Sequence, residues 1–200
     1  MAEDYEDYNE AYGQTQEWFD ALKKTIAPEA LVELLESRLA SAKHVAERKC
    51  LYFCLDETYS RLNRPDDALI TLMKQYEEFP DDPLSSLAVA GFYWAAMDQP
   101  QQALPWLEKA ELAAKASGTL IRYVLHDKAR VALALNDYRM LESCLVELAQ
   151  LRIRRDTADI RRERDFFDRA DKARLSKEVV EKYEAYLSAD PQTLYLDSQN

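Results

Sequence analysis

A repeat with a fixed spacing is the feature that most limits how this chain can fold. Residues 62–80 and 97–115 align at an offset of 35 residues, and both contain a proline followed three positions later by an alanine. A third, more divergent copy covers residues 135–151. A period of this length is typical of stacked helical repeats, in which each unit buries its apolar face against the next one.

A second apolar pattern precedes each copy, in residues 50–62, 84–97 and 121–135. Apolar residues recur there at steps of three and four, which is the period of an α-helix. Short polar turns join the two patterns, with Asn or Asp before the second helix and, in two copies, proline in its first turn. The sequence therefore predicts a repeated helical hairpin. Pro105, inside the second helix of the middle copy, predicts a slight bend or a helix start nearer residue 102.

The hairpin resembles the tetratricopeptide repeat, a helix–turn–helix unit of roughly 34 residues. Ala68 and Ala103 stand where that family has a small residue in the second helix, at the close approach of the two helices. Leu141 departs from the pattern in the third copy, and Asp56 departs from it at a small position of the first helix. The resemblance covers about residues 49–151 and implies a short stack of hairpins.

We expect an all-α fold of antiparallel helical hairpins stacked as a short solenoid similar to tetratricopeptide repeats, with capping helices at both ends. Apolar stripes predict flanking helices at residues 10–24, 27–47, 158–175 and 176–190. The expected organisation is a flexible acidic N-terminal arm at residues 1–9, one helical-repeat domain at 10–190 and a C-terminal tail at 191–200. Within that domain the core repeats cover about 49–151, flanked by helices in 10–47 and 152–190.

The composition argues against several classes of function. The chain carries a net charge of −11 with a pI of about 4.8, so we expect it to bind neither nucleic acid nor anionic membranes. No apolar run reaches the ~20 residues that span a bilayer, and the acidic start does not look like a secretory signal. The three cysteines, Cys50, Cys54 and Cys144, favour a reducing compartment and a cytoplasmic location. We expect them to be buried packing residues.

No catalytic constellation stands out. The sequence has no phosphate-binding loop, no nucleophile elbow, no zinc-protease pattern and no dinucleotide fingerprint. His126 and Asp127 are adjacent, but neighbouring residues of a helix point in different directions and do not form a dyad. Cys50 and Cys54 share a helix face, yet two ligands fall short of the usual metal site. We therefore expect neither an enzyme nor a cofactor or metal.

The resemblance places a ligand surface on the concave face formed by the first helix of each hairpin. The aromatic and charged positions of that face are Phe53, Glu57, Arg61, Phe92, Tyr123, His126 and Arg130. Aromatic anchors with charged neighbours suit an extended peptide or a helix. Phe53 and Glu57 replace residues that grip chaperone C-terminal tails in this family, which argues against that ligand. The alternative is that the flanking helices 10–47 fill this face as part of the core.

Charge is distributed unevenly along the chain. Residues 152–177 contain ten Lys and Arg against six Asp and Glu, whereas residues 1–37 contain ten acidic residues against two lysines. A candidate charged docking face comprises Arg154, Arg155, Arg161 and Arg162. The alternatives are a solvated helix with i,i+4 ion pairs, or a contact with the acidic N-terminus of the same chain or of a second copy in a homodimer.

These features predict a protein–protein interaction module, an adaptor or chaperone that holds a segment of another protein. The alternative is an acidic inhibitor of the immunity-protein or antitoxin type that covers a basic partner protein. Repeated hairpins without catalytic residues favour the first function, and the low pI with the acidic N-terminal arm favours the second.

Overall fold

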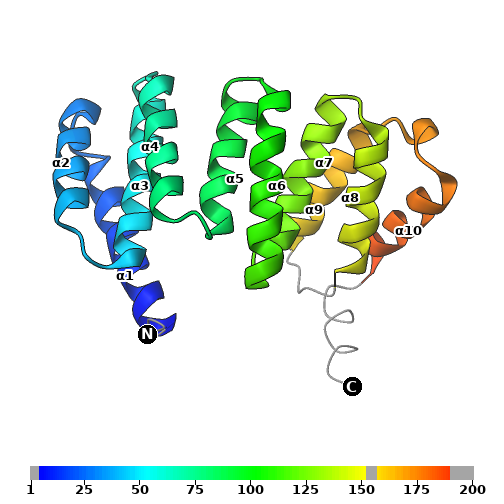
Figure 1. Cartoon of the computed structure of the whole chain (residues 1–200), viewed down its shortest axis with the longest axis horizontal. Helices are drawn as coiled ribbons and strands as arrows, with labels where there is room; N and C mark the ends of the chain where they lie inside the picture. The colour runs from blue at the N-terminus through cyan, green and yellow to red at the C-terminus, as the bar shows by residue number, and fades with distance from the viewer. Residues whose placement is uncertain (1–4, 152–156, 190–200) are drawn as a thin grey trace. The chain divides into compact units, whose positions relative to one another are not determined.

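The fold is all-α. The computed structural model describes residues 5–151 and 157–189, and within these ranges it contains helices and no strands. The helices gather into two compact units, residues 1–81 and residues 82–200, called the first and second units below. Figure 1 shows the antiparallel hairpins within each unit. That residues 10–190 make one domain stays a prediction.

The first unit is built around helix α3. It comprises α1 (Tyr5–Leu22), α2 (Pro28–Ser41), α3 (Val45–Arg61) and α4 (Pro65–Glu78). The predicted hairpin of α3 and α4 is present, and α1 and α2 both pack against α3. Helix α1 begins within the arm expected at residues 1–9. The expected single helix 27–47 is wrong: α2 ends at Ser41, and His44 begins α3 by accepting a hydrogen bond from the Ala46 amide.

The second unit contains two further hairpins and a C-terminal pair of helices. Its elements are α5 (Pro83–Gly91), the π-helical turn η1 (Phe92–Ala96), α6 (Pro100–Ser117), α7 (Ile121–Ala134), α8 (Tyr138–Gln150), α9 (Thr157–Arg169), the short 3₁₀ turn η2 (Lys172–Arg174) and α10 (Lys177–Ser188). Helices α5 and α6 pair, as do α7 and α8, while α10 packs on α8 and α9. The predicted helix 158–175 is interrupted after Arg169, and Asp171 then caps the 3₁₀ turn.

The predicted close approaches are occupied by small buried residues. Ala68, Ala103 and Ala129 are fully buried, which allows the paired helices to approach closely. The later start expected for the helix containing Pro105 is wrong, because α6 begins at Pro100 and continues through Pro105. Pro100 fits the first turn of α6, where its missing N–H has no helical partner.

Helices α9 and α10 complete the largest apolar core of the second unit. Phe166 and Phe167 of α9 and Tyr183 of α10 join Leu125 of α7 and Leu145 of α8 in one buried cluster. The C-terminal helices therefore contribute large core side chains. Over the residues that the structure describes, no helix is both long and apolar enough to cross a membrane.

Candidate functional site

An open groove in the second unit is the strongest candidate for a functional site. Its volume is about 410 Å³, within the range of binding sites. Helices α5, α7 and α9 and the connection between α6 and α7 supply its lining. The lining residues, which define the α7 groove, are Leu84, Leu87, Leu120, Tyr123, His126, Asp127, Arg130 and Arg162. The groove thus combines an aliphatic wall with a histidine, an aspartate and two arginines.

Leu120 holds a backbone conformation that leucine rarely adopts. It lies in the left-handed region, with φ 60°, just before α7 begins. The other described residues with positive φ are all asparagine, aspartate or glycine, which tolerate this region. For leucine the conformation costs on the order of 1–3 kcal/mol, and such strain gathers at functional sites. The strained conformation places a leucine in the wall of the α7 groove.

A π-helical turn supports Arg130. The turn η1 contains Trp94, and the Arg130 guanidinium carbon lies 4.5 Å from the centre of the Trp94 ring. Single π-helical turns occur frequently at functional sites. The nearest carboxylate oxygen of Asp127 is 3.9 Å from Arg130, which is a long ion pair. The arginine is therefore held mainly by the aromatic ring and keeps capacity for a further hydrogen-bond acceptor.

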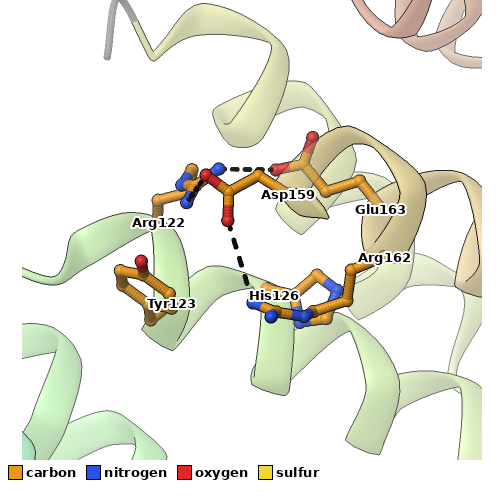
Figure 2. A pocket seen from close by; sticks show the side chains of 6 residues that line it. All are labelled: Arg122, Tyr123, His126, Asp159, Arg162 and Glu163. Carbon is orange, nitrogen blue, oxygen red and sulfur yellow. Dashed lines mark ion pairs between the residues drawn. The ribbon is translucent and has the colours of Figure 1, made fainter. Parts of the chain in front are cut away.

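A buried ion-pair cluster adjoins the groove and fixes α9 against α7. Arg122 of α7 is 7% exposed, and its guanidinium lies 2.6 Å from the Asp159 carboxylate and 3.7 Å from that of Glu163 (Figure 2). The Tyr186 hydroxyl of α10 donates a hydrogen bond to Glu163, at 3.3 Å. Burial acts against the charge of Arg122, but the hydrogen bond and charge of Asp159 outweigh it, so the Arg122 pKa lies above its usual value.

This cluster also positions Arg162, which reaches the α7 groove from α9. Its guanidinium is 3.8 Å from Asp159, whose closer partner is Arg122. Arg162 is exposed and lines both the α7 groove and a small cavity beside it (Figure 2). That cavity, about 10 Å³, has room for about one water molecule.

His126 brings a buried polar atom to the same place. The residue is only 6% exposed, because the ring of Phe166 from α9 packs edge-on against the imidazole at 5.0 Å. Its Nδ1 lies 3.7 Å from the Asp127 carboxylate. Among the described residues, its Nε2 has no hydrogen-bond partner. A buried polar atom without a partner is costly to the stability of the fold.

Four of the sequence-predicted site residues converge on the α7 groove. Tyr123, His126 and Arg130 come from the predicted concave face, and Arg162 comes from the predicted charged face. The expectation of an open surface is wrong for two residues. His126 is covered by α9, and Phe92 is 8% exposed, with its ring edge-on to Tyr93 at the start of the π-helical turn.

The other three predicted groove residues lie on α3, in the first unit. Phe53 is 49% exposed and Arg61 is exposed, whereas Lys23, in the turn after α1, lies 3.3 Å from Glu57. Helix α1 also packs against α3, but Phe53 and Arg61 stay exposed, so the flanking helices do not fill the whole of this face. Of the predicted charged face, Arg161 is exposed on α9 outside the groove lining, and Arg154 and Arg155 lie outside the described residues.

Sequence reasoning missed the apolar wall and the ion pairs behind it. Leu84, Leu87 and Leu120 were not singled out, because an aliphatic residue in a helical pattern gives no sign of lining a groove. Nor did the sequence indicate that Asp159 and Glu163 pair with Arg122. The described part of the chain holds no group of three or more His, Cys, Asp or Glu side chains that could bind a metal ion.

Comparisons with models of protein families, with curated proteins and with solved structures found no match to this chain.

Proposed function

We propose that this protein is an interaction module, an adaptor or chaperone, that binds a peptide or helix of a partner protein in the α7 groove. The observation that carries the proposal is the open groove with Leu120 in its wall. A leucine held at positive φ costs stability, and a function that needs an apolar side chain there would explain why it is kept.

Each part of the lining has a role in such a complex. Leu84, Leu87 and Leu120 would receive an apolar anchor side chain, since buried anchors supply most of the affinity of an interface. Arg130 and Arg162, with their long ion pairs, would orient the bound segment through its backbone carbonyls or side-chain acceptors.

The proposal includes a stack of hairpins similar to tetratricopeptide repeats. The offset of 35 residues between the first two copies and the buried alanines at the close approaches support it. In such stacks the first helices of successive hairpins line the binding face. Tyr123, His126 and Arg130 all belong to α7, the first helix of the last hairpin.

A groove variant with a matched surface control tests this function. Leu84→Asp places a charge in the groove wall, whereas Leu112→Asp places one at the most exposed leucine of α6, which is 72% exposed and outside the groove. We expect partners captured from the native lysate by the wild type to be retained by Leu112→Asp and lost by Leu84→Asp. Equal capture by both variants, with both folded by circular dichroism, would contradict the proposal.

An acidic inhibitor of a basic protein is the second candidate. Residues 1–81 contain 18 Asp and Glu against nine Lys and Arg, a net charge of −9, and Glu29 and Glu33 of α2 are exposed. Such a surface would attract a basic partner over a long range. A single stoichiometric partner that is released by salt and is unaffected by Leu84→Asp would favour this function over the first.

A further inference from the structure

The α7 groove has an apolar end and a cationic end. Its three leucines stand in the first two turns of α5 and directly before α7, and Leu87 and Ile121 pack against the same buried cluster. Arg130 stands in the third turn of α7 and meets Trp94, in the π-helical turn that follows α5. The leucines therefore line the end where α5 and α7 begin, and Arg130 lies toward the other end.

The polar part of the lining carries more positive than negative charge. The side chains of Arg130 and Arg162 are 39% and 52% exposed, whereas Asp127, the one carboxylate among the lining residues, is 23% exposed. Asp159, which lies 3.8 Å from Arg162, is outside the lining and pairs more closely with Arg122, at 2.6 Å. The groove thus presents two arginines beside an aliphatic wall, in a chain whose net charge is −11.

We propose that the segment bound in the α7 groove is acidic, with an apolar anchor side chain followed by carboxylates. This inference rests on the proposed function and names the chemistry of the partner. The anchor enters among the leucines, and the carboxylates accept hydrogen bonds from Arg130 and Arg162. Guanidinium groups match carboxylates in geometry, and an apolar wall strengthens their attraction because it keeps water away.

The spacing along α7 sets where the carboxylates fall. Arg162 borders a small cavity together with Tyr123, in the first turn of α7, so a first carboxylate follows the anchor closely. Arg130 is ten residues beyond Leu120, which is about 15 Å along a helix, so a second carboxylate lies farther from the anchor. A lysine-rich segment is disfavoured, because it places cations against both arginines.

A displayed library of random twelve-residue peptides tests the inference on the full chain. Selections run in parallel on the wild type and on Leu84→Asp, which places a charge at the apolar end. Peptides enriched by the wild type alone are expected to carry Asp or Glu near a leucine, isoleucine or methionine. If these peptides are neutral or basic, the inference is overturned and the proposed function stands. If no peptide depends on Leu84, both are overturned.

Anisotropy titrations then show whether the arginines make the contact. With the most enriched acidic peptide, labelled with fluorescein, Arg130→Gln and Arg162→Gln are each expected to weaken binding on the order of tenfold. Arg161→Gln, at an exposed arginine of α9 outside the groove lining, is the matched control and should leave the affinity unchanged.

A second peptide separates direct contact from damage to the fold. It carries Gln and Asn in place of the Glu and Asp of the first, and it should bind more weakly to the wild type and be nearly insensitive to Arg130→Gln and Arg162→Gln. Losses that are as large with this amide peptide, or equal losses with Arg161→Gln, would overturn the inference.

Discussion

The two units are built from the same kind of hairpin but differ in their net charge and in how they hold an arginine. Residues 1–81 have a net charge of −9, and residues 82–200 have 17 Lys and Arg against 19 Asp and Glu, a net charge of −2. In the first unit, Arg48 is partly exposed as it bridges Glu78 and the carbonyls of Leu39 and Ala42. In the second unit, Arg122 is buried between two carboxylates. The first unit is thus the more acidic one, and the second unit is the one with a buried arginine.

The helices that complete each unit differ in what they leave open. Helices α1 and α2 both pack on α3, and Lys23, in the turn after α1, forms an ion pair with Glu57. Helix α9 contacts α7 through Phe166 and the Arg122 ion pairs, but it leaves the α7 groove open between α5, α7 and α9. The first helix of a hairpin thus stays open, as a candidate binding surface, only where the helix beside it covers it incompletely.

Removing the buried arginine should have the largest effect. Arg122→Ala removes the buried cation that lies between the carboxylates of Asp159 and Glu163, and we expect it to cost about 3–5 kcal/mol of the free energy of unfolding. Arg48→Ala is the matched change in the first unit, where water reaches the ion pair, and about 1–2 kcal/mol is expected. Chemical denaturation followed by circular dichroism measures both.

Tryptophan fluorescence can assign each loss to a unit. Trp18 lies in the first unit, and Trp94 and Trp106 lie in the second. A variant that keeps only Trp18 therefore reports the unfolding of the first unit, and one that keeps only the other two reports that of the second. If Arg122→Ala and Arg48→Ala lower the free energy of unfolding by the same amount, the claim that the buried ion pair contributes more stability than the exposed one would be wrong.

Asp56 offers a pH-dependent test in the first unit. Burial, together with the nearby charge of Glu57, raises its pKa to about 6. Because the folded state holds this proton more tightly than the unfolded state, the stability of the wild type should fall as the pH rises from about 4 to about 6. Allowing for the partial exposure of the side chain, Asp56→Asn is expected to stabilise the protein at pH 7 by about 1–2 kcal/mol.

The gain from Asp56→Asn should be almost gone at about pH 3, where the aspartate is mostly protonated in both states. Urea denaturation of wild type and variant at several pH values checks this. A gain that is independent of pH would show that the carboxylate of Asp56 is not the cause.

Relieving the strain at Leu120 should have the smallest effect on stability. Asparagine tolerates positive φ, so Leu120→Asn is expected to stabilise the second unit by about 0.5–1 kcal/mol while it weakens partner capture. Asn136→Ala, at the other turn of α7 with φ 56°, is the matched control and should destabilise by about 1 kcal/mol. A Leu120→Asn variant that is less stable and captures partners normally would mean that the leucine only packs.

Much of the fold could be predicted from the sequence, because the hairpins have a repeating pattern. The offset of 35 residues and the apolar steps of three and four gave the pairs α3–α4, α5–α6 and α7–α8. The break at residues 42–44 was missed, because alanine and lysine there are good helix formers and histidine is an uncommon cap. The interruption after Arg169 was missed because the charged pattern continues through it.

The candidate site could be predicted only in part. The resemblance to tetratricopeptide repeats indicated Tyr123, His126 and Arg130, as positions on the binding face of the first helix of a hairpin. The burial of His126 depends on Phe166, a residue 40 positions away in the sequence, and the role of Leu120 depends on a backbone angle. Neither can be read from a local pattern, since both arise from the packing of α9 and from the turn before α7.

Site-directed photo-crosslinking tests the central claim, that partners bind in the second unit, most directly. A photoreactive phenylalanine analogue replaces Tyr123 in one variant and Phe53 in another; these aromatic residues are 44% and 49% exposed on α7 and α3. After irradiation in native lysate, the account predicts a discrete crosslinked partner from position 123 and little or none from position 53. A partner crosslinked only from position 53 would contradict it and place binding on the first unit.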